Sequence, residues 1–258
     1  ASINTWQVAA QYRLSDGAGS RPSVAGRAGA WGNYAEQLTK SSPTSLQGQT
    51  LNSVNVVDPK DTQYQLDLIA TWQLSERTEL SAFGGIGASR VKVGSINGTT
   101  SRGGCNYNLA FGPTEVVGTL AQMCNASTVV DRFTLPYSAF GVDPYKETRY
   151  NARFVNAGLS AKWTDGDWQL RGGYQYQALD RDNVDDLIRS RGGKAVEANH
   201  ILIGEVMYKL VKNVSLFARG QYMSKQFTGE IPFAYNTMTA RRFDQRYGIL
   251  TTGVVVSF

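Results

Sequence analysis

The sequence predicts an all-β protein, a transmembrane antiparallel up-and-down β-barrel. Nine segments alternate apolar and polar residues with a period of two, which is the pattern of strands with two unlike faces. The connections between these segments alternate between short turns and long polar loops, an arrangement typical of barrels that cross a membrane. Aromatic residues also gather at two levels along the strands, as they do at the two interfaces of a bilayer.

The composition is compatible with this fold. The chain has 258 residues, enough for one large domain, with 18% charged and 41% hydrophobic residues. Its mean hydropathy is −0.30. It lacks the run of about 18 apolar residues that a transmembrane helix requires. Alternating strands do not raise the average hydropathy, so a low value does not argue against a membrane barrel.

Four strands are predicted before residue 94, over about 3–14, 23–34, 63–74 and 78–93. The third is the clearest, because Tyr64, Leu66 and Leu68 alternate with Gln63, Gln65 and Asp67. A long polar loop, 35–61, precedes it, and a tight turn at 75–77 follows it.

The other five strands follow a segment of about fifty residues. We expect residues 95–145 to form one long loop, in which 116–123 and 128–135 are weak candidates for extra strands. The later strands are predicted around 155–163, 168–177, 200–210 and 214–225 and at the end of the chain. Asp165-Gly166 is a two-residue hairpin signal between the first two of these.

The aromatic residues separate this fold from a soluble β-sandwich, whose strands are usually only about 5–6 residues long. One set lies near the short turns: Tyr12, Trp72, Trp163, Trp168, Tyr208 and Phe258. A second set lies about eight to ten residues further along, a separation that matches an apolar band about 25 Å tall: Trp6, Tyr34, Tyr64, Tyr176 and Tyr222.

The two cysteines, Cys105 and Cys124, lie in one polar segment and predict a disulfide in an oxidising compartment. Two free thiols are the alternative. We expect no metal site, because no histidine lies near them, and no cofactor. The net charge of +5 comes from basic residues spread along the strands, so we expect no nucleic-acid partner.

The polar face of the strands should line the lumen of the barrel. The charged and amide residues predicted there are Arg13, Arg27, Asp67, Lys162, Arg171, Gln175, Glu205, Lys209, Arg219 and Lys225. Rings of Arg and Lys favour anions in a pore, and the many Gln residues suit a hydrated path. The alternative is that these charges pair with one another and fill a narrow barrel. If the lumen is open, the cysteine segment is the expected constriction.

The end of the chain carries a family resemblance. Leu250, Thr252, Val254 and Val256 lie on one face of a strand that ends at Phe258. This ending resembles the terminal strand of Gram-negative outer-membrane β-barrels of the porin-like kind. The resemblance implies a bacterial outer-membrane location, surrounding lipid, and recognition of Phe258 by the insertion machinery. It also implies periplasmic short turns and extracellular long loops.

The number of strands stays open. Bacterial single-chain barrels have even numbers, so nine readable strands imply a total of about 10–12. Three alternatives would resolve the odd count. They are a further strand before Ala1, a further strand within 95–145, or a larger barrel of which this chain is the C-terminal part. The chain is otherwise expected to be one barrel domain over residues 1–258.

Three basic residues fall on the outward face above the upper aromatic level. Arg149, Arg153 and Arg246 are therefore expected to contact the phosphates of lipopolysaccharide. His200, the only histidine, falls on the same face and is expected at the interface. Ile201-Leu202 follow it and Ala198 precedes it, so it lacks the Ser or Asp neighbours of outer-membrane phospholipases and omptin proteases. We therefore expect no enzymatic activity.

The function predicted first is a channel for small polar or anionic solutes. The alternative is a structural or scaffold barrel that acts through its loops or a bound partner. Residues 174–183 loosely resemble barrels that accompany polysaccharide export or that sheath multihaem cytochromes, which implies partner subunits. A homo-oligomer is also open.

Overall fold

A nine-stranded antiparallel sheet forms the body of the protein. The computed structural model describes residues 2–46, 48–124, 129–141, 143–226 and 229–256. The strands run in the order β1-β2-β6-β7-β12-β13-β14-β15-β16. Their bounds are β1 (Asn4–Ser15), β2 (Ser23–Tyr34), β6 (Lys60–Gln73), β7 (Thr78–Lys92), β12 (Asn151–Asp165), β13 (Trp168–Arg181), β14 (Ala198–Val211), β15 (Val214–Met223) and β16 (Tyr247–Val256).

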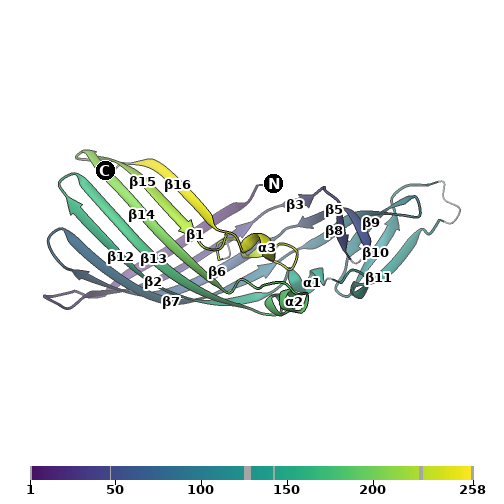
Figure 1. Cartoon of the computed structure of the whole chain (residues 1–258), viewed down its shortest axis with the longest axis horizontal. Coiled ribbons are helices and arrows are strands. Elements are labelled where there is room, and N and C mark those ends of the chain that lie inside the picture. Colours follow the sequence, from purple (N-terminus) through teal and green to yellow (C-terminus); the bar gives the residue numbers. More distant parts are fainter. Residues whose placement is uncertain (1, 47, 125–128, 142, 227–228, 257–258) are drawn as a thin grey trace.

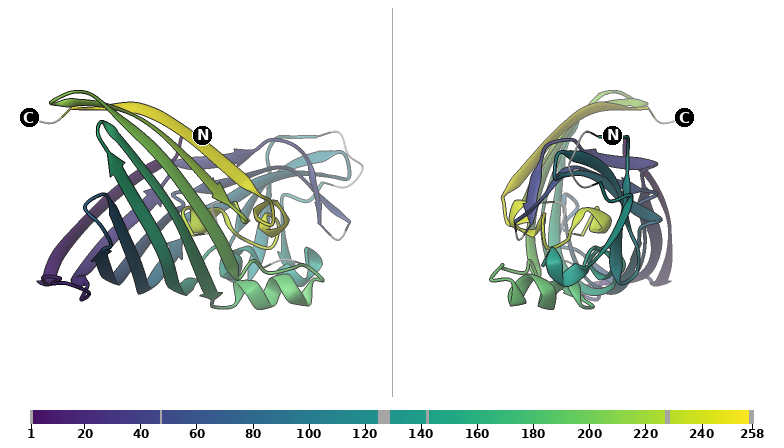
Figure 2. Two further views of the ribbon diagram at one scale, coloured as in Figure 1. Left: turned by 60° about the vertical axis from the view of Figure 1, so that its left-hand side comes forward. Right: turned by 90° about the vertical axis from the view of Figure 1, so that its right-hand side faces the viewer.

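These nine strands are the nine that the alternation predicts, and the prediction of an all-β antiparallel sheet is confirmed. The short turns lie at one end of the sheet and the long connections at the other (Figure 1). The sheet curls around a hollow (Figure 2), but the predicted closed barrel of about 10–12 strands is not observed. Within the described residues β1 and β16 are not paired with each other. Eight antiparallel steps separate these two edge strands, so both run in the same direction.

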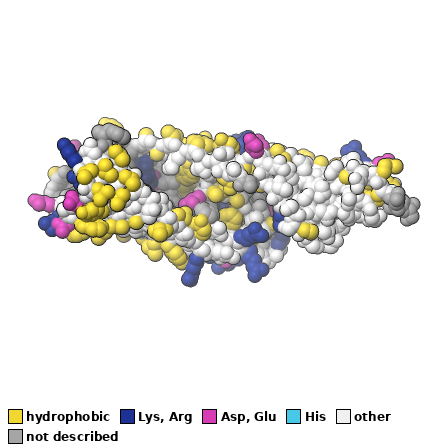
Figure 3. All heavy atoms as spheres, turned by 90° about the horizontal axis from the view of Figure 1, so that it is seen from above, with side chains coloured by type: hydrophobic (Ala, Val, Ile, Leu, Met, Phe, Trp, Pro, Cys, Tyr) yellow, Lys and Arg dark blue, Asp and Glu magenta, His cyan; other side chains and the backbone are white. Residues whose placement is uncertain are grey.

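The main sheet exposes apolar side chains on its outer face and buries polar side chains on its inner face, which is the reverse of a soluble protein. Leu66 and Leu68 are 60% and 57% exposed on the convex face, whereas Gln63, Asn156 and Asn199 are only 1–4% exposed on the concave face. Figure 3 shows hydrophobic side chains gathered at the end of the molecule that holds the short turns. Such a large exposed apolar area marks a surface that meets lipid or another apolar partner.

A second, smaller sheet extends from the long-loop end. It contains β3 (Gln37–Lys40), β4 (Thr44–Leu46), β5 (Gln49–Val57), β8 (Ser95–Arg102), β9 (Cys105–Phe111), β10 (Glu115–Leu120) and β11 (Arg132–Pro136). β5 leads into β6 and β7 leads into β8 after two residues each, so this sheet prolongs the β6–β7 hairpin. It has its own core, formed by Leu51, Leu109, Val116, Tyr137 and Phe140.

This sheet corrects the prediction that residues 35–61 and 95–145 are loops. Both stretches consist mostly of short strands, and β10 and β11 overlap the two weak candidates at 116–123 and 128–135. The sequence hid them because the strands are short and many of their exposed positions carry Ser, Thr or Asn.

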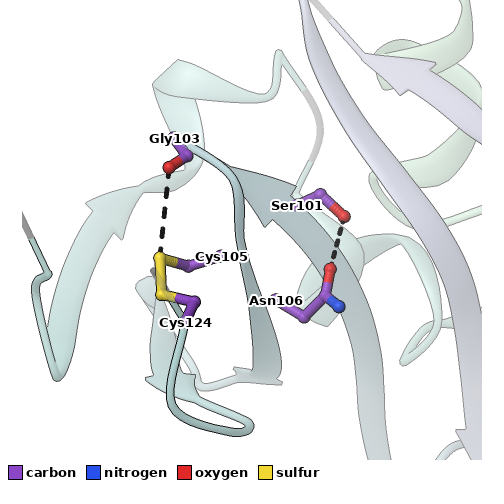
Figure 4. The surroundings of a disulfide bond; sticks show 5 residues. All are labelled: Ser101, Gly103, Cys105, Asn106 and Cys124. Carbon is purple, nitrogen blue, oxygen red and sulfur yellow. Dashed lines mark hydrogen bonds between the residues drawn. A yellow bond between two sulfur atoms is a disulfide. The ribbon is translucent and has the colours of Figure 1, made fainter. Parts of the chain in front are cut away.

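The predicted disulfide is present and joins the start of β9 to the segment after β10. Cys105 and Cys124 have Cα atoms 5.4 Å apart. Beside the bond, Ser101 Oγ donates to Asn106 Oδ1 at 2.7 Å across the β8–β9 hairpin (Figure 4). The disulfide therefore closes the far end of the second sheet.

The helices are short and lie at the long-loop end. They are η1 (Tyr137–Ala139), α1 (Pro144–Glu147), α2 (Val184–Ser190), η2 (Pro232–Ala234) and α3 (Ala240–Phe243). Among the described residues, no helix has both the length and the apolar character needed to cross a bilayer.

If the convex face meets lipid, a charge placed on it will destabilise the protein strongly. Leu159, at the middle of β12, is 55% exposed on this face. Leu159→Arg is expected to lower the free energy of unfolding of the protein in lipid vesicles by about 2–4 kcal/mol. Gln175→Arg on the concave face is the control and should cost far less. Equal stability of the two variants in urea titrations would contradict the assignment of the faces.

Loss of the disulfide is expected to loosen the second sheet alone. The bond closes a loop with a sequence separation of 19, and a loop of about this size contributes about 3 kcal/mol. Limited proteolysis of Cys105→Ser should cut within 95–136 while the nine-stranded sheet stays intact. Cys124→Ser and the double variant should behave identically, and cleavage that begins in the main sheet would argue against two independent units.

Candidate functional site

The long-loop end of the curled sheet is crossed by residues 229–246, here called the capping segment. The segment connects β15 to β16, at one edge of the sheet, yet it reaches strands far from that edge. Asn33 Nδ2 in β2 donates to the backbone carbonyl of Glu230 at 2.6 Å. The Tyr150 hydroxyl, just before β12, donates to the carbonyl of Pro232 at 2.7 Å. The turn η2 of this segment lies next to β6 and β7, and Figure 2 shows the yellow helical turns of the segment near the start of β16.

Apolar side chains anchor the capping segment. Phe233, Tyr235 and Ala240 are at most 4% exposed and pack with residues from β7, β12, α2 and the segment before β14. The wall side of this cluster consists of Val91, Tyr150, Ala152, Val184, Ile188 and Val196. Burying a side chain such as Phe contributes about 1.5–3 kcal/mol, so the segment is held firmly to the wall.

Polar contacts around Tyr235 hold the anchor in one orientation. Its hydroxyl accepts from the Val196 backbone N–H at 2.9 Å and donates to Asp185 Oδ1 at 3.2 Å. Burial raises the pKa of Tyr235 to about 12, so the hydroxyl keeps the proton that it donates. The guanidinium of Arg181 lies 4.1 Å from the centre of the Tyr235 ring and 3.3 Å from Asp185 Oδ1.

The capping segment corrects the expectation that the cysteine segment forms the constriction. The strands of this segment, β8 to β11, belong to the second sheet and not to the main one. The signal for the packing of the capping segment was present in Ile231-Pro232-Phe233-Ala234-Tyr235, an apolar run inside a connection otherwise expected to be polar. Such a run in a loop indicates that the loop packs against something.

Beneath the capping segment lie two adjoining cavities. The upper one, about 530 Å³, is bounded by Gly229, Glu230 and Ile231 of the capping segment. The lower one, about 500 Å³, lies toward the short turns. Four residues line both cavities: Arg27, Gln175, Ile203 and Arg219. The two cavities therefore adjoin along the polar face of the curled sheet.

Six polar residues and one glycine, here called the polar row, lie side by side on seven neighbouring strands of the lumen face. The row runs from β1 to β14 through Gln11, Arg27, Asp67, Gly85, Asn156, Gln177 and Asn199. Arg27 Nη2 lies 2.8 Å from Asp67 Oδ2, and Gln65 Nε2 donates to Asp67 Oδ1 at 2.7 Å. A Cβ on Gly85 would lie only 2.1 Å from Asp67 Oδ1, so glycine leaves the space that this carboxylate occupies.

A second row, here called the charged row, lies closer to the short turns. Its members are cross-strand neighbours on β7, β12, β13, β14 and β15: Glu79, Lys162, Arg171, Glu205 and Arg219. Lys162 Nζ pairs with Glu79 Oε2 at 3.0 Å. Arg171, Glu205 and Arg219 form no hydrogen bond or ion pair between side chains of the described residues, and all three line the lower cavity.

Seven of the ten predicted lumen residues line these cavities. Arg27, Lys162, Arg171, Gln175, Glu205 and Arg219 line the lower one, and Asp67 lines the upper one. Arg13 instead pairs with Asp16 at 3.1 Å and is 71% exposed near a short turn. Lys209 is exposed near the β14–β15 turn. Lys225 lies beyond the end of β15 and pairs with Asp244, so its placement on a strand was wrong.

The residues predicted outside the lumen are spread widely. Arg149 donates to the carbonyl of Gly94 at 2.9 Å and lies over the ring of Tyr145. Arg153 is exposed on the convex face of β12, and Arg246 precedes β16, four strands away. His200 Nδ1 and the Tyr174 hydroxyl are 2.8 Å apart on the convex face. Phe258 lies outside the described residues.

No protein-family model matches the chain, and no curated protein matches its sequence. Similar solved structures include the outer-membrane protease OmpT from Escherichia coli, with 10% identity, 92% of this chain and 79% of that chain covered, and a TM-score of 0.33. The CymD monoaromatic hydrocarbon channel has 11% identity, coverage of 86% and 68%, and a TM-score of 0.30. The copper transporter OprC has 10% identity, coverage of 98% and 41%, and a TM-score of 0.20. Likenesses this weak carry no argument about function.

These structures nevertheless correct one expectation. We expected that the chain is not an enzyme, but one of the similar structures is that of a protease. That expectation is therefore withdrawn, and the chain is not assigned as a non-enzyme. Among the described residues, no group of three His, Cys, Asp or Glu side chains is placed to hold a metal ion.

Removal of the main anchor is expected to release the capping segment. Phe233→Ala deletes a buried ring, a change that typically costs about 3–5 kcal/mol. Hydrogen exchange of the backbone amides in 229–246 should accelerate at least tenfold, while amides in β13 and β14 keep their protection. Met238→Ala, at an exposed position of the same segment, is the control. Unchanged exchange in Phe233→Ala would show that the apolar cluster does not hold the segment.

Proposed function

We propose that this protein is an outer-membrane channel that passes small polar or anionic solutes through the lumen of the curled sheet. The observation that supports this proposal best is the pair of adjoining cavities, which extends from the capping segment to the charged row and is lined by amide and charged side chains. The apolar convex face supports a membrane location, because such a surface is stable only in apolar surroundings.

The polar lining supports a water-filled lumen. The amide side chains that line the upper cavity include Gln65, Gln175, Gln177 and Gln221. Such groups both donate and accept hydrogen bonds, so they suit contact with water or a polar solute. They therefore favour a hydrated path over a lumen filled by its own side chains.

The charges of the lower cavity support a preference for anions. Arg27 and Lys162 are engaged by carboxylates, but Arg171 and Arg219 have no ion-pair partner among the described residues, with Glu205 on the strand between them. These two cations against one carboxylate give the lower cavity a local positive excess, whereas Glu230 adds a carboxylate to the upper cavity. Basic rings favour anions in a pore.

A closed wall is part of this proposal. The unpaired edges of β1 and β16 would leave backbone N–H and C=O groups without partners in hydrocarbon, at several kcal/mol each. The two edge strands run in the same direction, so one further strand antiparallel to both would complete a ten-stranded barrel. An even number of strands is the rule for bacterial barrels.

Recording in planar bilayers tests the channel directly. Stepwise openings with chloride preferred over potassium are expected. Arg171→Glu combined with Arg219→Glu should shift the preference toward potassium, because both changes reverse free charges in the lumen. Arg13→Glu, which alters a charge outside the cavities, is the control and should leave the reversal potential unchanged. A silent bilayer would contradict the channel and favour a scaffold role, to which the projecting second sheet is suited.

A further inference from the structure

The lower cavity contains an arrangement of charge that a channel for simple ions does not need. Arg171, Glu205 and Arg219 are neighbours on three adjacent strands, β13, β14 and β15. Adjacent strands lie about 4.8 Å apart, so the backbone positions of the two arginines lie on either side of Glu205 and span about 10 Å. None of the three is engaged by another described side chain. All three are therefore available to a solute.

The two kinds of charge require two kinds of group on the solute. A guanidinium only donates, and it pairs well with a carboxylate through two parallel hydrogen bonds. An ionised carboxylate such as that of Glu205 only accepts, so the solute must also present a donor within a few ångströms of its own anionic group. A simple inorganic anion such as chloride or nitrate has no donor and would be repelled by Glu205. A simple carboxylate such as acetate would leave Glu205 unsatisfied.

The rest of the cavity favours hydroxyl groups as these donors. Its neutral polar lining consists of Gln11, Thr71, Ser81, Ser160 and Gln175, which can both donate and accept. Phe83 and Ile203 add an apolar surface that suits the C–H face of a sugar ring. A volume of about 500 Å³ is ample for a molecule of this size. A short amino acid could place its ammonium at Glu205 but would leave most of the hydroxyl and amide lining unused.

We infer that the lower cavity binds a small hydroxylated carboxylate, a sugar acid, with its carboxylate at Arg171 or Arg219 and its hydroxyl groups at Glu205 and the neutral polar lining. This inference rests on the proposed channel function, since it names the class of solute that the same lumen takes. The net single positive charge of the three free groups matches a monoanion.

Two readouts on the whole protein test the inference. In planar bilayers carrying chloride current, galacturonate should interrupt the current at concentrations at least tenfold lower than galactose, acetate or glycine. Isothermal titration calorimetry in detergent should give the same order of affinities. Arg171→Gln combined with Arg219→Gln should weaken galacturonate binding at least tenfold. Glu205→Gln should reduce the ratio of the affinity for galacturonate to the affinity for acetate, because Glu205 is assigned to the hydroxyl groups of the sugar acid.

Arg13→Gln is the matched control and should bind galacturonate as the unaltered protein does. A shift in gel mobility on heating checks that each variant has folded. If the double variant Arg171→Gln with Arg219→Gln does not fold, the two single variants replace it. Equal binding of acetate and galacturonate, or tighter binding of glycine, would overturn the inference. Chloride current without galacturonate binding would overturn it and leave the channel function standing. Galacturonate binding by a protein that gives no current in the bilayer would overturn the channel function and leave the binding site standing.

Discussion

The structure depends on one constraint, which is that a β-strand shows alternate side chains to opposite faces while its backbone groups pair sideways. A sheet whose outer face is apolar can meet hydrocarbon only if its backbone groups are satisfied by neighbouring strands. In nine successive antiparallel strands this condition is met everywhere except at the two edges, β1 and β16. Because of the same alternation, each strand residue whose two neighbours in sequence face outward must itself face the lumen. The polar row and the charged row are therefore consequences of the fold and not separate additions to it.

The capping segment narrows the lumen without filling it. Its large side chains, Phe233 and Tyr235, are anchored in an apolar cluster at the wall, and the part that faces the upper cavity includes Gly229 and the backbone of Glu230. A Cβ at Gly229 would lie 2.5 Å from Gln177 Oε1, so the backbone approaches the wall closely there. Because the two aromatic groups are held at the side, a solute would meet Glu230, Ile231 and the amide side chains of the upper cavity first and the charged row afterwards.

The sequence predicted the main sheet well because each of its strands is long and two-faced. The alternation in 63–74 alone identifies β6 and assigns Gln65 and Asp67 to the lumen. The second sheet was missed because its strands are short and much of their exposed surface carries Ser, Thr or Asn, as in 95–102, so they resemble a polar loop. Lys225 was placed on a strand because periodicity does not show where a strand ends. The availability of Arg171, Glu205 and Arg219 could not be predicted either, since it depends on which carboxylates pair with which cations across strands distant in sequence.

The central claim is that the convex face meets lipid and the concave face meets water. Spin labels placed singly at residues 65–70 of β6, in protein reconstituted into lipid vesicles, test it most directly. Collision with oxygen, which concentrates in hydrocarbon, should be greatest at positions 66, 68 and 70. Collision with a water-soluble nickel chelate should be greatest at positions 65, 67 and 69. Two profiles that rise and fall together, or that show no period of two, would contradict the account.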